Sequence, residues 1–422
     1  MKNFFVGLKD FFKKQIVFVV AILLAVISTI IFKPSGKEIL GAIDFRSLSI
    51  LFSLMAVVQA FSLNGAFTFL SLKIISGVKK SWLLIFALVC ICFFFSMFIT
   101  NDVALITFVP LTISLLQSAG LSSLILITIV LQTLAANLGS MLTPVGNPQN
   151  LYLFNLMKCD VWSFIKIMLP YSCASFLLLI ICIFFVKGFL ERRRCGALTG
   201  EVAVSGRGGA LTKEALLSKI APAFPKETPL SKTTVLSPKE TTQSQTAAPF
   251  LKVKLILFSL LALISLLTVF NFIPYYVTLP LVLICIFFAE RRALKKVDYI
   301  LLLTFVGFFI FTGNLSHSQK ISFLISSVLQ KREILCGIIS SQVISNVPAA
   351  ILLSGFTENL KELTVGVNLG GLGTLIASMA SLISFKFYAG LKNSNGAKYI
   401  LIFSILNILF LGILYGMTFF FF

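Results

Sequence analysis

Apolar runs of roughly 18 or more residues recur along this chain, and they constrain its fold more than any other feature. A helix that crosses a bilayer needs about 20 such residues, and the core of a soluble domain does not call for so many runs of that length. The composition agrees, because 58% of the residues are hydrophobic and only 12% are charged. Nothing alternates with the period of two that a membrane β-barrel requires. The sequence therefore predicts an all-α polytopic membrane protein.

The charge distribution and the cysteines fit a membrane protein, and neither requires nucleic-acid binding or disulfide bonds to explain it. The net charge of +20 comes from basic residues in the terminal segment and connecting loops, which is typical of positive-inside topology rather than of nucleic-acid binding. This pattern predicts a cytoplasmic amino terminus in the cell membrane. A signal peptide is the alternative for the first run, Ile16 to Phe32, but Lys33-Pro34 stands where a cleavage site would be. The eight cysteines include no C-x-x-C pair and mostly lie in apolar runs, so we expect packing residues.

The stretch from Ala136 to Asn150 cannot form a regular membrane helix. Pro144 and Pro148 each remove an amide donor, and glycines loosen the backbone between them. Unwound backbone at bilayer depth survives only where it lines a cavity or is buried in protein. A second copy lies 231 positions further on, where Asn137, Gly139 and Thr143 are matched by Asn368, Gly370 and Thr374. We therefore expect two broken helices that face one site.

Asp102 is the only charged residue across the 77 positions from Ser81 to Met157. An ionisable group between two apolar runs is costly and usually functional. Two geometries fit Thr100-Asn101-Asp102: the turn between two ordinary spans, or the tip of a re-entrant hairpin that stops inside the membrane. Asp102 is the candidate for cation or proton coupling, and a helix cap near Val103 is the alternative role.

The second half of the chain repeats this plan. Asp298 opens a span as Asp44 does, and a break is expected at Gly313-Asn314 to match Asn64-Gly65. Ser345-Asn346-Val347-Pro348 occupies the place of the first hairpin tip. An inserted span between the copies reverses their orientation, and an inverted repeat with matching polar interruptions is the signature of a secondary transporter.

Three regions follow from this pattern. We expect a first transmembrane half over residues 1–187, a disordered basic cytoplasmic linker over 188–252, and a second half over 253–422. Each half contains one re-entrant hairpin and one broken helix, giving about ten or eleven membrane segments in all. The interval from about 196 to 246 has no membrane-length run, so we expect it to be dispensable for transport.

The motifs at these interruptions resemble those of the ion transporter superfamily. That group includes arsenical-pump-type permeases, citrate-transporter-like proteins, divalent-anion/sodium symporters and sodium/proton antiporters. The resemblance rests on Thr100 to Ala104, on Asn137-Leu138-Gly139 with Pro144 to Asn150, and on Ser345 to Pro348. It implies two hairpins entering from opposite faces and a mobile transport domain, often on a homodimeric scaffold. Some arsenical-type permeases also use a separate ATPase subunit.

The chemistry of the expected site follows from the broken helices. A new helix start exposes amide donors that suit anions, and a new helix end exposes carbonyls that suit Na⁺. Capping and helix packing alone are the alternative role for these polar groups. Within the site, we expect any Na⁺ to lie near Asn101, Asp102, Asn137 and Gly139. The full set of expected substrate- and ion-binding residues is Asn101, Asp102, Asn137, Gly139, Thr143, Asn147, Asn150, Ser345, Asn346, Asn368, Gly370 and Thr374.

The sequence thus predicts a secondary active transporter, moving a small inorganic or organic anion with Na⁺ or H⁺ as coupling ion. Alternatives are a cation/proton antiporter, an arsenite-type efflux permease and, from another class, an ion channel. No G-x-x-x-x-G-K-[ST] loop, G-x-S-x-G elbow or His/Glu metal cluster occurs, so we expect neither an enzyme nor a cofactor.

Overall fold

A computed structural model describes residues 15–75, 78, 80–197, 244–392 and 394–421. All regular secondary structure in these ranges is helical, as the sequence predicts. In chain order the elements are α2 (Ile16–Phe32), α3 (Gly36–Ala42), α4 (Phe45–Leu63), α5 (Ala66–Ile75), α6 (Ser81–Phe95), α7 (Asn101–Ser118), η1 (Ser122–Leu124), α8 (Ile125–Ser140), α9 (Pro148–Met157), α10 (Val161–Ala197), α13 (Ser244–Val269), α14 (Tyr275–Lys295), α15 (Tyr299–Ser316), α16 (Gln319–Leu329), α17 (Glu333–Ile344), α18 (Asn346–Ser354), α19 (Leu360–Gly370), α20 (Met379–Ala389) and α21 (Gly396–Phe421).

Six helical segments among the described residues are long and apolar enough to cross a membrane. They are Phe45–Leu63, Asn101–Ser118, Ser122–Ser140, Val161–Gly188, Tyr299–Ser316 and Gly396–Phe421. The chain is therefore a multi-pass membrane protein. By contrast, α17 and α18 have 12 and 9 residues. At 1.5 Å per residue they span only about 18 and 14 Å, short of the ~30 Å hydrocarbon core, as the legs of a re-entrant hairpin would be.

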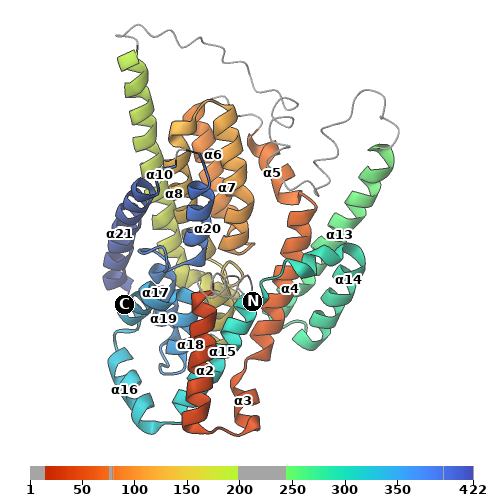
Figure 1. Cartoon of the computed structure of the whole chain (residues 1–422), viewed down its shortest axis with the longest axis vertical. Helices are drawn as coiled ribbons and strands as arrows, with labels where there is room; N and C mark the ends of the chain where they lie inside the picture. Colours follow the sequence, from red (N-terminus) through yellow and green to blue (C-terminus); the bar gives the residue numbers. More distant parts are fainter. Residues whose placement is uncertain (1–14, 76–77, 79, 198–243, 393, 422) are drawn as a thin grey trace, which may run out of the picture.

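The two helix pairs that carry the polar tips lie in opposite halves of the molecule. Figure 1 shows α6 and α7 in the upper half and α17 and α18 in the lower half. Their tips nevertheless line one cavity, to which α7 contributes Asn101 and α18 contributes Asn346. Whether both helix pairs are re-entrant hairpins that enter from opposite faces stays a prediction, and α7 is itself long enough to cross a membrane. Whether the two halves cross the bilayer in opposite directions stays a prediction.

The helices that precede each hairpin exchange partners between the halves. Helix α2 of the first half packs along α15 of the second, and α14 of the second half packs along α4 of the first. Small side chains allow the α2–α15 approach, since a Cβ on Gly307 would lie 3.1 Å from Ala21. This crossed pairing joins the helices that begin the two halves.

The break predicted at Gly313-Asn314 is wrong, because α15 runs through both residues to Ser316. The Asn314 amide donates to the hydroxyls of Ser28 and Thr29 at 2.9 and 3.0 Å, and a Cβ on Gly313 would meet Ala42 at 2.6 Å. These residues mediate packing against α2 and α3 rather than ending a helix. The matching prediction in the first half is confirmed: α4 ends at Leu63.

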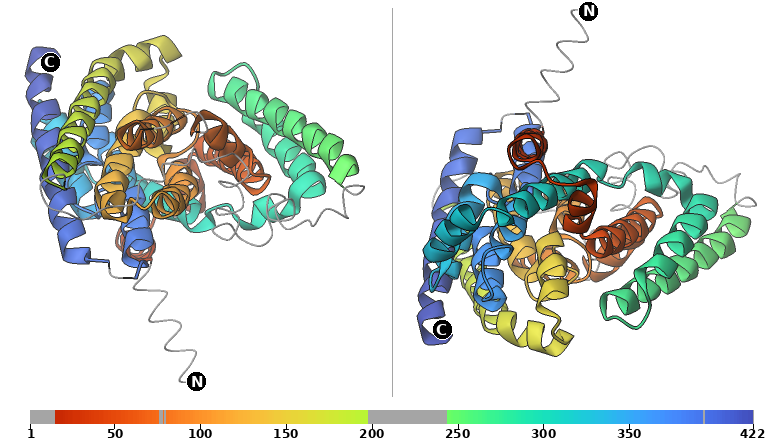
Figure 2. Two further views of the ribbon diagram at one scale, coloured as in Figure 1. Left: turned by 90° about the horizontal axis from the view of Figure 1, so that it is seen from above. Right: turned by 90° about the horizontal axis from the view of Figure 1, so that it is seen from below.

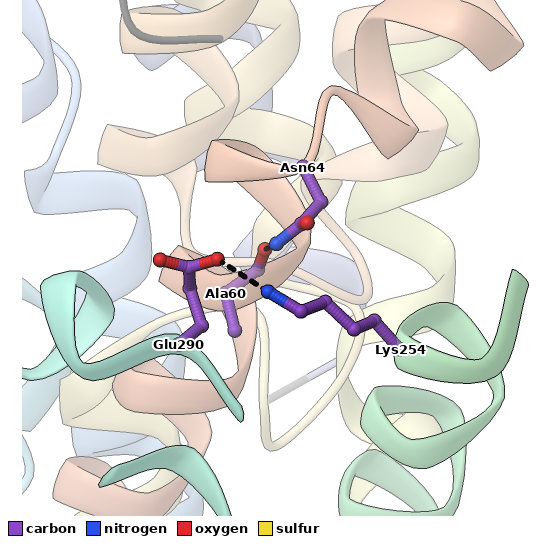
Figure 3. A network of polar contacts seen from close by, with 4 residues as sticks. All are labelled: Ala60, Asn64, Lys254 and Glu290. Carbon is purple, nitrogen blue, oxygen red and sulfur yellow. Dashed lines mark hydrogen bonds and ion pairs between the residues drawn. The ribbon is translucent and has the colours of Figure 1, made fainter. Parts of the chain in front are cut away.

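An outer layer of two helices, α13 and α14, lies on the side of α4 away from the hairpins (Figure 2). Helix α14 kinks at Glu290, whose backbone leaves helical geometry at φ −157° and ψ 66°. The Glu290 carboxylate accepts from Lys254 of α13 at 3.1 Å, close to the end of α4 at Asn64 (Figure 3). This ion pair ties α13 to the kink in α14.

The linker predicted over 188–252 falls mainly on residues 198–243, which lie outside the described ranges. Helix α10 continues to Ala197 and α13 begins at Ser244, so both helices run into the interval that the sequence assigns to the linker.

Candidate functional site

The two hairpin tips and the starts of α9 and α20 enclose a cavity of about 40 Å³. One water needs about 10–15 Å³ measured in this way, so the cavity holds a few waters or a small ion. It is too small for a multi-carbon substrate in this state. Its polar and charged lining residues are Gln15, Asn101, Asp102, Gln149, Asp298, Thr304, Ser345, Asn346 and Ser378.

The first broken helix opens between α8 and α9, as predicted. Pro148 occupies the first turn of α9, where its missing amide costs nothing. A Cβ on Gly146 would lie 2.1 Å from the Ser140 carbonyl oxygen, so only glycine fits this turn. The Asn150 amide donates to the carbonyls of Ser140, Met141 and Thr143 at 3.2–3.3 Å. Asn150 therefore satisfies carbonyls that the break sets free.

The second broken helix opens between α19 and α20 without proline. Gly373 adopts a φ of +108°, which favours glycine. Gln342 of α17 performs here the task of Asn150: its amide donates to the carbonyls of Gly370 and Leu372, each at 2.8 Å, and its oxygen accepts from the Thr374 amide at 2.9 Å. No sequence signal predicted this role for Gln342, because the residue lies inside an apolar hairpin leg.

The two breaks are joined to each other by paired hydrogen bonds. The Asn137 amide donates to the Ser381 hydroxyl at 3.3 Å, and the Asn368 amide donates to the Asn150 oxygen at 2.6 Å. Both donors and both acceptors are separated by 231 positions, so the two contacts are copies of one another.

The contacts between hairpins and breaks are paired in the same way. The Thr143 hydroxyl donates to the Met97 carbonyl, and the Thr374 hydroxyl donates to the Gln342 carbonyl at 3.4 Å. The acceptors lie 245 positions apart, as Asn101 and Asn346 do. Corresponding glycines at the breaks lie against Ser96 in one half and Ser341 in the other. Such reciprocal geometry is what an internal repeat produces.

The first hairpin tip presents both an amide and a carboxylate. The Asn101 amide donates to the Asn137 oxygen at 2.9 Å, and that oxygen also accepts from the Ser378 hydroxyl at 3.0 Å. Thr100 is the residue that precedes α7, and Asp102 lies one position inside the helix with its own amide bonded to Asn101. The capping role is therefore not the one that Asp102 fills, and its carboxylate lines the cavity.

The second tip is apolar where the first is charged. Ser345 adopts φ 73° and ψ 155°, a region that costs a residue with a Cβ of order 1–3 kcal/mol. At this strained turn the Ser345 hydroxyl donates to the Ala377 carbonyl of the second break at 3.3 Å, and the backbone N–H of Asn346 donates to the same carbonyl at 3.1 Å. Val347 and Pro348 then complete the wall.

The predicted site residues fall into two groups. Asn101, Asp102, Ser345 and Asn346 line the cavity. The others hold the breaks together or to the hairpins: the Asn147 amide, for example, donates to the Ser140 hydroxyl within the first break at 2.7 Å. The sequence did not predict three other residues of the cavity, Gln149, Ser378 and Asp298. Gln149 lies within the motif from Pro144 to Asn150, but it was not named as a site residue. Gln149 is 1% exposed and its amide nitrogen has no hydrogen-bond partner among the described residues.

The charge of the lining is one-sided. Asp102 and Asp298 both line the cavity, whereas no Lys or Arg of the described chain does. Two carboxylates around so small a space favour a bound cation or proton, and an anion would need a cation beside it.

Paired helix breaks around a buried polar cavity, in an all-helical multi-pass chain, define a membrane transporter. Comparison with known proteins agrees: residues 12–364 match the citrate transporter (CitMHS) family, and the chain belongs to that family. It is 28% identical to the uncharacterized transporter MJ0456 of Methanocaldococcus jannaschii over 89% of this chain and 90% of that one. It is 29% identical to the inner membrane protein YbiR of Escherichia coli over 82% and 80% of the two chains. It is 28% identical to the mouse P protein over 31% of this chain and 16% of that one. The family match confirms the resemblance to the ion transporter superfamily.

Proposed function

We propose that the protein is a secondary active transporter that moves a small anion together with a cation, Na⁺ or H⁺, held at Asp102. The observation that carries this proposal is the meeting of both hairpin tips and both helix breaks at one cavity that contains a carboxylate. Amide donors at helix starts suit the anion, and the carboxylate with nearby carbonyls suits the cation. The family description makes citrate the first substrate to test.

The cavity lies at helix ends that the basic residues assign to the cytoplasm. It is lined by Gln15, which precedes α2, and by Asp298, which opens α15 after the basic cluster from Arg291 to Lys296. If the amino terminus lies in the cytoplasm, as the basic residues predict, we expect the site of this state to face inward. Substrate entry then requires the small cavity to widen toward that side.

Cation/proton antiport is the second candidate. It is favoured by the pair of carboxylates and by the lack of a basic side chain in the described lining. An antiporter needs no anion site, so the amide groups at the tips would then serve as helix caps.

Transport by the purified protein in proteoliposomes distinguishes these proposals. We expect labelled citrate to accumulate under an imposed Na⁺ or pH gradient, and preloaded citrate to drive counterflow. Counterflow requires a carrier, so its absence alongside rapid ion flux would indicate a channel. Gradient-driven exchange of Na⁺ for H⁺ without any anion would instead support antiport.

Two assembly proposals accompany this function. We expect a homodimer and no need for a separate ATPase subunit. Accumulation in the proteoliposomes without ATP supports the second expectation, and the mass of the detergent-solubilised protein tests the first.

A further inference from the structure

Asp44 and Asp298 occupy equivalent positions in the two halves. Asp44 precedes α4 with φ −79° and ψ 83°, and Asp298 precedes α15 with φ −79° and ψ 84°. Each carboxylate accepts from the backbone amide three residues on, at 3.0 and 2.9 Å. Two helix starts 254 positions apart are thus built alike.

The structure nevertheless uses the two aspartates differently. Asp298 lines the cavity together with Asp102 and Val347. Asp44 instead bonds to the Ser47 hydroxyl, which in turn accepts from Asn155 near the end of α9 at 2.9 Å. The surrounding helices show the same asymmetry, because α15 packs on α18 whereas α4 packs on α9. Among the described residues, α4 with α7 and α15 with α20 make no contact of similar extent.

We propose that Asp298 and Asp44 alternate as the scaffold carboxylate that faces the hairpin tips. In the observed state Asp298 faces the site. In a second state, reached when the two halves exchange their packing, α4 lies against α7 and brings Asp44 to the cavity. This inference rests on the proposed transport function, which requires two states of one site.

The alternation gives each state a second carboxylate beside Asp102. Like charges repel across a small cavity, so a cation bound between them favours either closed arrangement. An empty site would hold the scaffold and the tip apart. The pair of aspartates therefore provides one cation contact on each side of the membrane, although only one hairpin tip is charged.

Paired cysteines test the exchange without any substrate. Ile300→Cys with Pro348→Cys joins two residues that line the present cavity. The repeat offsets of 254 and 245 give Arg46→Cys with Val103→Cys as the corresponding pair for the second state. Each is treated in membrane vesicles with a short thiol-specific cross-linker, and the single-cysteine variants report any link to native thiols.

Both pairs should cross-link, and a protein already linked through the first pair should no longer link through the second when all four cysteines are present. Failure of the second pair in protein that transports would overturn the inference and leave the transport function standing. Cross-linking of both pairs in protein that moves no substrate would support the exchange and count against the proposed function.

The variants Asp298→Asn and Asp44→Asn remove the negative charge and keep the helix cap, because Asn caps a helix as well as Asp does. In sodium-free choline chloride buffer, removing one charge should relieve repulsion in one state alone. We expect Asp298→Asn to raise the yield of the first pair, and Asp44→Asn that of the second, by roughly twofold or more. Equal shifts in both variants, or none, would show that the aspartates only cap their helices.

Discussion

The two halves of this protein share an architecture but not a chemistry. Reciprocal contacts hold both broken helices, with Asn137 and Asn368 donating across the interface between the breaks. The tips differ, since the first offers Asp102 on a relaxed turn whereas the second offers Val347 after a strained Ser345. The shared architecture therefore forms the cavity, and the difference between the two tips places the Asp102 carboxylate in it.

The largest effect is expected where each broken helix packs most closely against the hairpin of its own half. A Cβ on Gly139 would lie 2.1 Å from the Phe93 carbonyl oxygen, while on Gly370 the nearest atom is the Ser341 hydroxyl at 2.5 Å. A backbone carbonyl can move aside less easily than a side chain can. We therefore expect Gly139→Ala to lower the free energy of unfolding by about 3 kcal/mol, and Gly370→Ala to lower it by less. Thermal unfolding in detergent measures the difference.

Gly412→Ala is the matched control, because nothing lies within 4 Å of its Cβ position. It should leave the unfolding temperature unchanged or raise it slightly. Equal losses for the substitutions at 139 and 370 would mean that the two hairpins are held equally tightly, contrary to the comparison.

Asn137→Ala and Asn368→Ala should each abolish transport while the protein still inserts. Asn137 bonds Asn101, Ser378 and Ser381, so its loss leaves more buried groups unpaired, at about 1–3 kcal/mol each. We expect Asn137→Ala to be the less stable variant.

Asn407→Ala serves as the control for these variants. Asn407 is also fully buried, but it bonds only the Phe403 carbonyl of its own helix in the described structure. This variant should lose stability and keep transport. Full transport by Asn137→Ala or Asn368→Ala would contradict a shared site.

A smaller difference is expected at the helices that close each half. Asp160 caps α10, and hydrogen bonds from Ser163 lower the pKa of its exposed carboxyl. Asn395 caps α21 with a neutral amide oxygen. A lowered pKa stabilises the fold above the carboxyl's ordinary value, near 4, and this contribution is lost as the pH falls through the folded value.

Asp160→Asn should therefore flatten the acid limb of a stability profile slightly, without a change at pH 7. Asn395→Asp is the reciprocal substitution and should add an acid-dependent loss to the second half. An unchanged acid limb in both variants would show that these caps do not contribute.

The smallest effect on transport is expected from changes in the segment that connects the two halves. Because crossed helix packing joins them, replacing residues 198–243 by a short Gly/Ser linker should leave uptake nearly intact. The check is uptake per inserted molecule. A large loss would assign this interval a docking or regulatory role.

The sequence predicted those features of the fold that depend on nearby residues, such as the breaks in the helices. Proline, glycine and asparagine mark the breaks, so both broken helices were predicted. The contact of Gln342 with the second break and the position of Asp298 at the cavity depend on helices that meet only in the fold. The break predicted at Gly313-Asn314 was wrong for the same reason. These residues pack against α2, a contact that exists only in the folded protein.

The central claim is that one site built by both halves couples transport to a cation through the charge of Asp102. Uptake by wild-type and Asp102→Asn proteoliposomes, under imposed Na⁺ or pH gradients, tests it most directly. We predict that the variant exchanges substrate but fails to accumulate it, since Asn keeps the shape and removes the charge. Unchanged gradient dependence in Asp102→Asn would contradict the claim and move the coupling ion to the carbonyls around the breaks.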